Sequence, residues 1–408
     1  MLLLLSGSFV FCAPDGRIVQ ERGAGKVRLI RYDDGQWQML VDGAPYFIKG
    51  VVYEPVKIGE RLKASNTWMN YDFNNNGRPD TAYDAWVDAN ANNVQDEEEK
   101  AVGDFQLLKD MGCNTIRIYH PVNIKKEVLR DLFERYGIRV MMGHFLGAYT
   151  WGSGASWDKG TDYTDPVQRQ RMMDDVKKMV LEHKDEPYVL FWMLGNENEM
   201  RGSEENSTLN NTNARLYPQA YTAFVNEVAA MIHALDPDHP VGISNASMFM
   251  MKYYAKNAPE IDIVGMNAYM GPHGFGTMWR AIQMDFDRPV VITEYGVDCY
   301  NQVKKCIDED FQAKYYRGCW KDMVQNGFGG GGAGNSLGGF AYNWLDSWWF
   351  CGSPSEHDTE KGAWRGPAND AWMNDEWMAV CSQGDGKQSP FMRQLRKVYF
   401  MFQKEWTS

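Results

Sequence analysis

The chain has 408 residues, of which 44% are hydrophobic and 24% are charged. This composition is typical of a soluble globular protein with a large core, and it excludes a disordered or fibrous chain. The formal net charge of -12 disfavours nucleic acid as a partner, because a negative surface repels a phosphate backbone.

The N-terminal segment, residues 1–26, opens with a short apolar run, MLLLLSGSFVFCA. Small residues at Cys12 and Ala13 follow the run and favour a secretion signal, although no basic residues precede it. A disordered N-terminus is the alternative. The run is too short to span a bilayer, so we expect a secreted, periplasmic or cell-surface protein without a membrane span.

Residues 27–48 alternate apolar and polar side chains and contain two Asp-Gly turns, at Asp34-Gly35 and Asp42-Gly43. This pattern predicts a hairpin. Because it precedes the first barrel strand proposed below, we expect it to cover the bottom of the barrel.

From residue 47 onward, short apolar runs alternate eight times with amphipathic stretches, which predicts a (β/α)8 TIM barrel in a single catalytic domain, residues 27–408. The predicted strands are Phe47–Tyr53, Thr115–Tyr119, Arg139–Gly143, Tyr188–Leu194, Val241–Ser244, Ile261–Asn267, Val290–Thr293 and Gly339–Trp344. The clearest helices are Glu97–Met111, Lys125–Tyr136, Pro166–His183, Pro218–Leu235, Asp308–Asn326 and Ser389–Trp406. An open doubly wound sheet is the alternative, but only the barrel brings the ends of strands four and seven together.

An acidic insert at about 70–99 separates the first strand from its helix. Its oxygen-bearing side chains have the spacing of EF-hand-type calcium loops, with ligands at positions one, three, five, nine and twelve. The predicted ligands are Asp72, Asn74, Asn76 and Asp80 in a first loop, and Asp88, Asn90, Asn92, Asp96 and Glu99 in a second. The tandem resembles the short calcium loops of dockerins and thrombospondin type 3 repeats, although Tyr83 occupies position twelve of the first loop.

We therefore predict structural calcium in this insert, as one or two ions, against the alternative of a solvated Asn/Asp loop. Millimolar extracellular calcium would suit such a site, which also favours export.

Two glutamates follow predicted strands four and seven: Glu197 in FWMLGNENEM and Glu294 in VVITEYGVD. Since the carboxyl ends of all strands meet at one face of a barrel, we expect both side chains in one pocket. Hydrolysis of a glycosidic bond needs one carboxyl that donates a proton and one carboxylate that attacks the anomeric carbon or activates water. The pair predicts a glycoside hydrolase.

LFWMLGNENE and ITEYGVD resemble the acid/base and nucleophile motifs of clan A glycoside hydrolases, particularly the barrel domain of glycoside hydrolase family 2. The resemblance extends from about Phe47 to Trp344. It implies retaining double displacement, with Glu197 as acid/base and Glu294 as nucleophile. Family 2 enzymes carry β-sandwich domains before the barrel, whereas the hairpin alone precedes it here, so the resemblance does not identify the sugar.

The resemblance also implies roles for four substrate-site residues. Arg117 in TIRIYHP would pair with the nucleophile, and Tyr269 in MNAYMG would donate a hydrogen bond to it. Asn196 would bind the 2-hydroxyl of the sugar, and Trp344 in AYNWLD would form the floor beneath the ring. A plain packing or ion-pair role is the alternative for Arg117 and Tyr269.

Aromatic and imidazole side chains also stand near the predicted strand ends. His120 and His144 either line the sugar site or serve as structural histidines. Tryptophans after strands three, six and eight either stack on sugar rings or pack against loops; they are Trp151, Trp157, Trp279, Trp348 and Trp349. They favour a polysaccharide or oligosaccharide, and a plant, algal or fungal β-glucan is the first choice.

Two other functions fit the same residues. A transglycosylase shares the covalent intermediate, and a noncatalytic carbohydrate-binding barrel would keep the scaffold alone. No cofactor is expected for catalysis. The chain has seven cysteines, and two pairs within single loops, Cys299 with Cys306 and Cys351 with Cys381, would form disulfides in an oxidising compartment; free thiols are the alternative.

Overall fold

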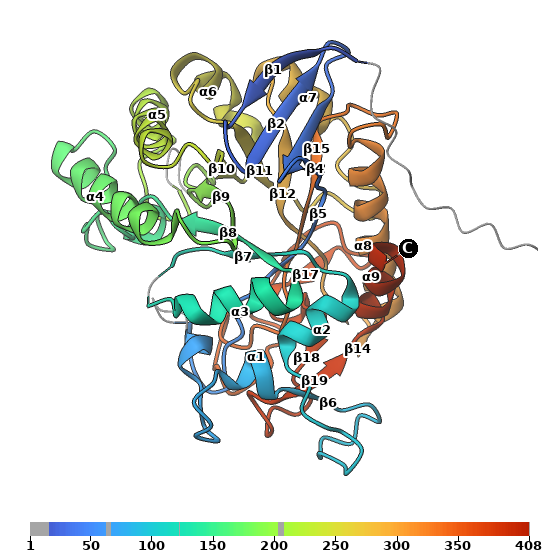
Figure 1. The fold of residues 1–408 in the computed structure, drawn as a ribbon. Coiled ribbons are helices and arrows are strands. Elements are labelled where there is room, and N and C mark those ends of the chain that lie inside the picture. Colours follow the sequence, from blue (N-terminus) through green and yellow to red (C-terminus); the bar gives the residue numbers. More distant parts are fainter. Residues whose placement is uncertain (1–15, 63–66, 122, 203–207, 408) are drawn as a thin grey trace, which may run out of the picture.

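Eight parallel strands form a closed barrel in the computed structural model, which describes residues 16–62, 67–121, 123–202 and 208–407 (Figure 1). The strands are β5 (Ile48–Val52), β7 (Thr115–Ile118), β8 (Arg139–His144), β9 (Val189–Leu194), β10 (Val241–Asn245), β11 (Ile263–Asn267), β12 (Val290–Tyr295) and β15 (Ser336–Ala341). They follow one another around the barrel in chain order, and β15 pairs with β5 to close it. Every residue of β9 is buried, as expected for a parallel strand covered on both faces.

A helix follows each barrel strand and packs on its outside. These helices are α2 (Asp104–Met111), α3 (Lys126–Tyr136), α4 (Pro166–His183), α5 (Pro218–Leu235), α6 (Met251–Asn257), α7 (Met278–Asp285), α8 (Glu309–Gln325) and α9 (Lys397–Thr407). Helices α4 and α5 have the predicted bounds because proline at the first helical position marks their start. The closed ring of strands and helices confirms the predicted (β/α)8 TIM barrel.

Three predicted elements differ from the structure by three residues or more, and the other bounds agree within two residues. The eighth strand begins at Ser336, three residues earlier than predicted, because the glycines at its start give no apolar signal. Helix α2 begins at Asp104 rather than Glu97, since Gly103 precedes it with a φ of 82°. Helix α9 begins at Lys397 rather than Ser389, because Met392–Leu395 form a strand first.

An antiparallel sheet covers the amino-terminal end of the barrel. It consists of β1 (Ile18–Arg22), β2 (Val27–Tyr32), β3 (Trp37–Val41) and β4 (Ala44–Pro45), so the predicted hairpin is part of a larger sheet. Trp37 donates to Asp287, just before β12, and Arg22 bonds to Asp262, just before β11. The sheet therefore lies at the predicted end (Figure 1, top). Residues 18–22 of the N-terminal segment belong to it, whereas the apolar run of the expected signal falls within residues 1–15, outside the described chain.

The acidic insert is tied to the C-terminal segment at the opposite end of the barrel (Figure 1). It contains α1 (Asp80–Asp84) and β6 (Trp86–Val87), and β6 forms a sheet with β19 (Met392–Leu395) and β18 (Cys381–Ser382). Arg393 of β19 forms a bidentate ion pair with Asp104 of α2, at 2.7 and 2.9 Å. Both side chains are 0% exposed.

Short elements in the loops complete the described fold. They are η1 (Thr67–Asn70), η2 (Ala148–Thr150), η3 (Met248–Met250), β13 (Tyr300–Asn301), β14 (Cys306–Ile307), β16 (Ala363–Arg365), β17 (Trp372–Asn374) and η4 (Asp375–Trp377). Within the described ranges no helix is long and apolar enough to cross a membrane. All six described cysteines are free thiols, so neither predicted disulfide is present; Cys299 and Cys381 are buried, whereas Cys306 is exposed.

Candidate active site

Glu197 and Glu294 lie at the carboxyl end of the barrel, after β9 and within β12. Asn267, at the end of β11, donates to Glu197 Oε1 at 3.0 Å. The amide oxygen of Asn267 accepts a hydrogen bond from Arg117 Nη1 (3.2 Å). The same Arg117 nitrogen donates to Glu294 Oε1 at 2.9 Å. One amide and one guanidinium therefore link the two carboxyl groups, which places both in a single site.

Three donors surround the carboxylate of Glu294. Arg117 forms a buried ion pair with it, Tyr119 donates to Oε1 at 2.5 Å, and Tyr269 donates to Oε2 at 2.8 Å. Burial raises the pKa of both tyrosines well above the usual value, so their hydroxyls keep the protons that they donate. Hydrogen bonds of this kind hold the carboxylate in a fixed position, as a nucleophile requires.

The environment of Glu197 favours the protonated form. Burial raises its pKa to about 8, and the negative charge of Glu294 adds to the effect. Its backbone is in the left-handed region, at a φ of 56°, and the side chain of Asn210 donates to its carbonyl at 3.1 Å. A non-glycine residue held in this conformation is a feature that concentrates at functional sites. Glu197 is therefore a carboxyl group that holds a proton at neutral pH.

Asn196 lies between the two glutamates. Its Oδ1 accepts from Arg117 Nη2 (2.9 Å) and from Asn267 (3.1 Å), and its amide donates to Tyr149 at 3.3 Å. The side chain is thus held in place from three sides, next to the groups that would contact a sugar.

Trp344 does not face this site, so the predicted floor residue is wrong. It is 0% exposed, and its ring packs on Tyr399 of α9 at 6.4 Å. The ring of Tyr342, two residues earlier, lies 6.4 Å from the ring of Tyr269 instead. Burial raises the pKa of Tyr342, and the charge of Glu294 adds to this shift. The reason is that β15 ends at Ala341, so strand alternation no longer tells which way the next side chains point.

Sequence reasoning missed several other site residues. Tyr119 and Asn267 each lie two residues from a predicted one, Arg117 and Tyr269 respectively. Asn267 is the last residue of β11, and a polar side chain at the carboxyl end of a barrel strand was a usable signal. Tyr119 lies one residue beyond β7, where no such signal exists.

Two further carboxyl groups lie near Glu294. Glu54 follows β5, where burial raises its pKa to about 8, the charge of Arg117 opposes this shift, and the charge of Glu294 adds to it. Asp375 of η4 accepts from the indole of Trp364 (3.2 Å), whose ring contacts Tyr269 at 6.2 Å. Burial raises the pKa of Asp375 to about 7, to which Glu294 also contributes. The site is therefore rich in carboxyl groups.

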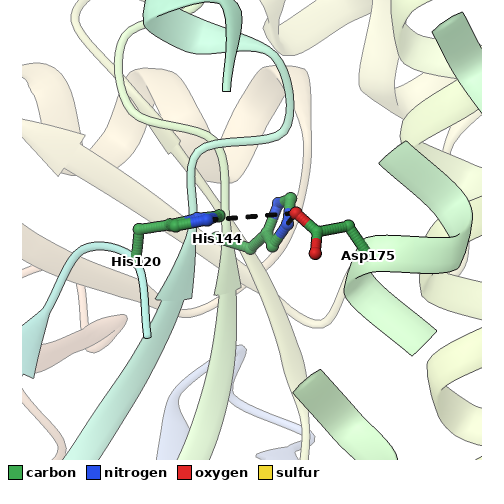
Figure 2. A group of neighbouring side chains, drawn as sticks. All are labelled: His120, His144 and Asp175. Carbon is green, nitrogen blue, oxygen red and sulfur yellow. Dashed lines mark hydrogen bonds and ion pairs between the residues drawn. The ribbon is translucent and has the colours of Figure 1, made fainter. Parts of the chain in front are cut away.

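His120 and His144 turn toward Asp175 of α4 (Figure 2). His144 Nε2 lies 3.1 Å from Asp175 Oδ2 and His120 Nε2 lies 3.9 Å from it. The Nδ1 of His144 accepts the backbone N–H of Leu146 (3.0 Å) and the Nδ1 of His120 accepts that of Phe145 (3.4 Å), which leaves Nε2 as the donor toward Asp175. Burial lowers the pKa of His120 to about 3. The hydrogen bond between His144 and Asp175 links β8 to α4, and His120 lies beside it.

The predicted stacking tryptophans differ in exposure. Trp279 is 1% exposed and donates to Asp322 at 2.8 Å, while Trp348 is 8% exposed and stacks on His357. For these two, the packing alternative given by the sequence holds. Trp157 is 63% exposed, and Trp151 is half-buried beside His120 at 5.0 Å. Trp349 is also half-buried.

A parallel eight-stranded barrel with two linked glutamates at its carboxyl end has the architecture of a barrel-type glycoside hydrolase. The family model described as "Glycosyl hydrolases family 2, TIM barrel domain" matches residues 92–328, more than half of the chain. The chain belongs to this family, which confirms the assignment made from the two glutamate motifs.

Curated relatives include the β-glucuronidases of Felis catus and Canis lupus familiaris, each 26% identical over 209 residues. Each match covers 48% of this chain and 27% of the relative, so the chain matches about a quarter of the relatives' length.

Similar solved structures include the β-D-glucuronidase of Dictyoglomus thermophilum (TM-score 0.53, 16% identity) and a GH2 β-galacturonidase of Eisenbergiella tayi (TM-score 0.53, 15% identity). Each comparison covers 95% of this chain and 53% of the other chain. At these identities the likeness concerns the fold alone.

Proposed function

We propose that this protein is a retaining β-glycoside hydrolase in which Glu294 is the nucleophile and Glu197 the acid/base. One observation carries the proposal: two linked carboxyl groups have opposite environments, with Glu294 paired to Arg117 and the pKa of Glu197 raised to about 8. Environments that separate two carboxyl groups in this way assign one as acid and the other as nucleophile.

The reaction would have two steps. A Glu294 oxygen attacks the anomeric carbon while Glu197 donates its proton to the leaving oxygen, giving a glycosyl ester and an alcohol. Glu197, now ionised, takes a proton from water, and the resulting hydroxide displaces Glu294 from the sugar. NMR of the first-formed product tests this: the initial β-anomer supports the scheme, and an initial α-anomer contradicts it.

The raised pKa of Glu197 predicts a basic limit to activity. We expect kcat/KM to fall as the pH rises through about 8, because ionised Glu197 cannot protonate a leaving alcohol. The measurement is kcat/KM from pH 5 to 10. A dinitrophenyl glycoside is the control, since its leaving group needs no proton and the fall should be much smaller. The same fall with both substrates would contradict the role of Glu197.

The relatives named above make a β-glucuronide the first substrate class to test. They give no support to the β-glucan favoured by the sequence. One structural observation favours a second class, neutral or amino sugars: Glu54 and Asp375 add two carboxyl groups to the site, and Arg117, the cation acting on Glu54, is already paired with Glu294. A uronate carboxylate would add negative charge to a site in which burial already raises the pKa of both carboxyl groups, without a free cation among these groups.

Replacing Glu54 by Gln distinguishes the two classes. Because burial raises the pKa of Glu54 to about 8, the comparison is made at pH 8.5 with dinitrophenyl glycosides, whose leaving group needs no proton. We expect kcat/KM for the β-glucuronide to rise several-fold relative to the matched β-glucoside, because the change removes repulsion of a uronate by ionised Glu54. Glu182→Gln on the exposed surface of α4 is the control. Equal changes for both substrates would show that Glu54 does not sense substrate charge.

Two assays separate the remaining alternatives. Products longer than the substrate, formed at high oligosaccharide concentration, would indicate a transglycosylase, since a sugar hydroxyl then intercepts the glycosyl-enzyme. Sugar binding without turnover of any panel substrate would indicate a noncatalytic binding barrel.

A further inference from the structure

The acidic insert folds into two loops with matching hydrogen bonds. In each loop the carboxylate of the first aspartate accepts the backbone N–H groups four and five residues later. These bonds join Asp72 to Asn76 (2.9 Å) and Gly77 (3.0 Å), and Asp88 to Asn92 (3.1 Å) and Asn93 (2.9 Å). The predicted sets of oxygen-bearing side chains are thus each gathered around one turn.

The second loop is closed by its own side chains. Asp96 Oδ2 accepts the amides of Asn90 (2.7 Å) and Asn92 (3.0 Å). The two oxygens of Glu99 accept backbone N–H groups from Ala89 (2.7 Å) and Asp96 (3.1 Å). Residues 88–99 contain no buried side-chain oxygen without a hydrogen-bond partner in the described structure. Nothing in this loop requires an ion.

Asp80 distinguishes the first loop. It occupies position nine and is 0% exposed. Its Oδ2 accepts the N–H of Phe73 inside the loop (2.8 Å), but its Oδ1 is buried and has no hydrogen-bond partner. A buried carboxylate oxygen without a partner is unfavourable unless a cation or a donor compensates it.

A third carboxylate completes the first loop in a way that the sequence spacing did not predict. Tyr83, at position twelve, turns away and donates to Asp131 at 2.8 Å. The next residue, Asp84, contacts the loop instead: its Oδ2 accepts a hydrogen bond from the side-chain amide of Asn76 at 2.8 Å. Arg78 lies 3.6 Å from Asp84 but is 53% exposed, so it is a weak surface partner. Three carboxylates therefore surround the loop with little compensating positive charge.

We propose that the first loop binds one structural Ca²⁺. Its oxygen donors are three carboxylates, two amides and the position-seven carbonyl: Asp72, Asp80, Asp84, Asn74, Asn76 and Arg78. Hard oxygen donors of this number suit Ca²⁺, whereas Mg²⁺ requires a tighter octahedron and retains several waters. The insert lies at the end of the barrel opposite the β1–β4 sheet (Figure 1), so the ion would brace a loop on the side of the candidate active site.

Calcium binding to the full chain tests this site. Protein stripped with chelator is titrated with CaCl₂, and separately with MgCl₂, by calorimetry and thermal unfolding. We expect saturable Ca²⁺ binding and a higher Tm, with a much smaller response to Mg²⁺. Asp80→Asn and Asp84→Asn should each weaken binding by about tenfold or more, the scale for disturbing a metal site. Asp96→Asn, the matched change in the second loop, should leave this binding intact.

Each result of these titrations either supports or contradicts a Ca²⁺ site in the first loop. Two bound ions, one of them lost in Asp80→Asn and Asp84→Asn, would also support it. Absence of Ca²⁺ binding would overturn it, as would binding that Asp96→Asn weakens and the first-loop variants do not. Asp84→Asn keeps the test decisive if Asp80→Asn fails to fold, since the side chain of Asp84 is 13% exposed and its bond to Asn76 is at the surface. These readouts do not depend on glycosidase activity.

Discussion

Glu294→Gln is expected to abolish hydrolysis, lowering kcat by about 10⁴-fold or more, the scale for loss of a catalytic nucleophile. Glutamine has nearly the same shape, and its single oxygen can still accept from Tyr119 or Tyr269, but its amide cannot attack the anomeric carbon. The measurement is the steady-state rate with an aryl glycoside that the wild-type protein cleaves. Sugar binding by the variant, followed by calorimetry, should persist.

Glu182→Gln is the matched control, because Glu182 is exposed on α4, on the outside of the barrel. It should retain wild-type activity, and both variants should unfold at temperatures close to that of the wild type. Turnover by Glu294→Gln within tenfold of the wild-type rate would show that another group is the nucleophile.

Asp104→Ala is expected to have the largest effect on stability, lowering the free energy of unfolding by about 3–5 kcal/mol. The variant would leave Arg393, whose side chain is 0% exposed, as a buried charge without its carboxylate partner. Tyr53 would also lose the acceptor of its hydroxyl, at 3.0 Å. Urea unfolding followed by circular dichroism measures the difference.

Two companion variants test the cause. Asp104→Ala combined with Arg393→Met should be less destabilised than Asp104→Ala alone, because the unpaired charge is then removed. Glu227→Gln, which breaks an exposed ion pair with Arg169, should cost less than about 1 kcal/mol. A similar loss in Asp104→Ala and Glu227→Gln would mean that burial of the pair does not determine its contribution.

The barrel could be predicted because its signals are local. Runs such as VLFWML are apolar at every position, which is typical of strands buried on both faces, and Pro166 and Pro218 mark helix starts. The start of α9 could not be predicted, since Met392–Leu395 becomes a strand through pairing with β6, about 300 residues away in sequence.

The candidate site was predictable where strand geometry applies. Arg117 and Tyr269 end barrel strands or follow them closely, and both contact Glu294. Trp344 was assigned from its resemblance to the family motif, but it lies three residues beyond the end of β15 and its ring packs on Tyr399. Asp375 could not be found at all, since it reaches the site from a long loop whose path depends on tertiary packing.

Arg117 contacts three other side chains of the site at once. Its two terminal nitrogens bond to Glu294, Asn267 and Asn196. Changes at these positions will therefore not act independently: in a double-mutant cycle, the combined effect of two of them should differ from the sum of the single effects. A lysine has one nitrogen in place of the planar fork, so even a charge-preserving exchange at position 117 would loosen all three neighbours together.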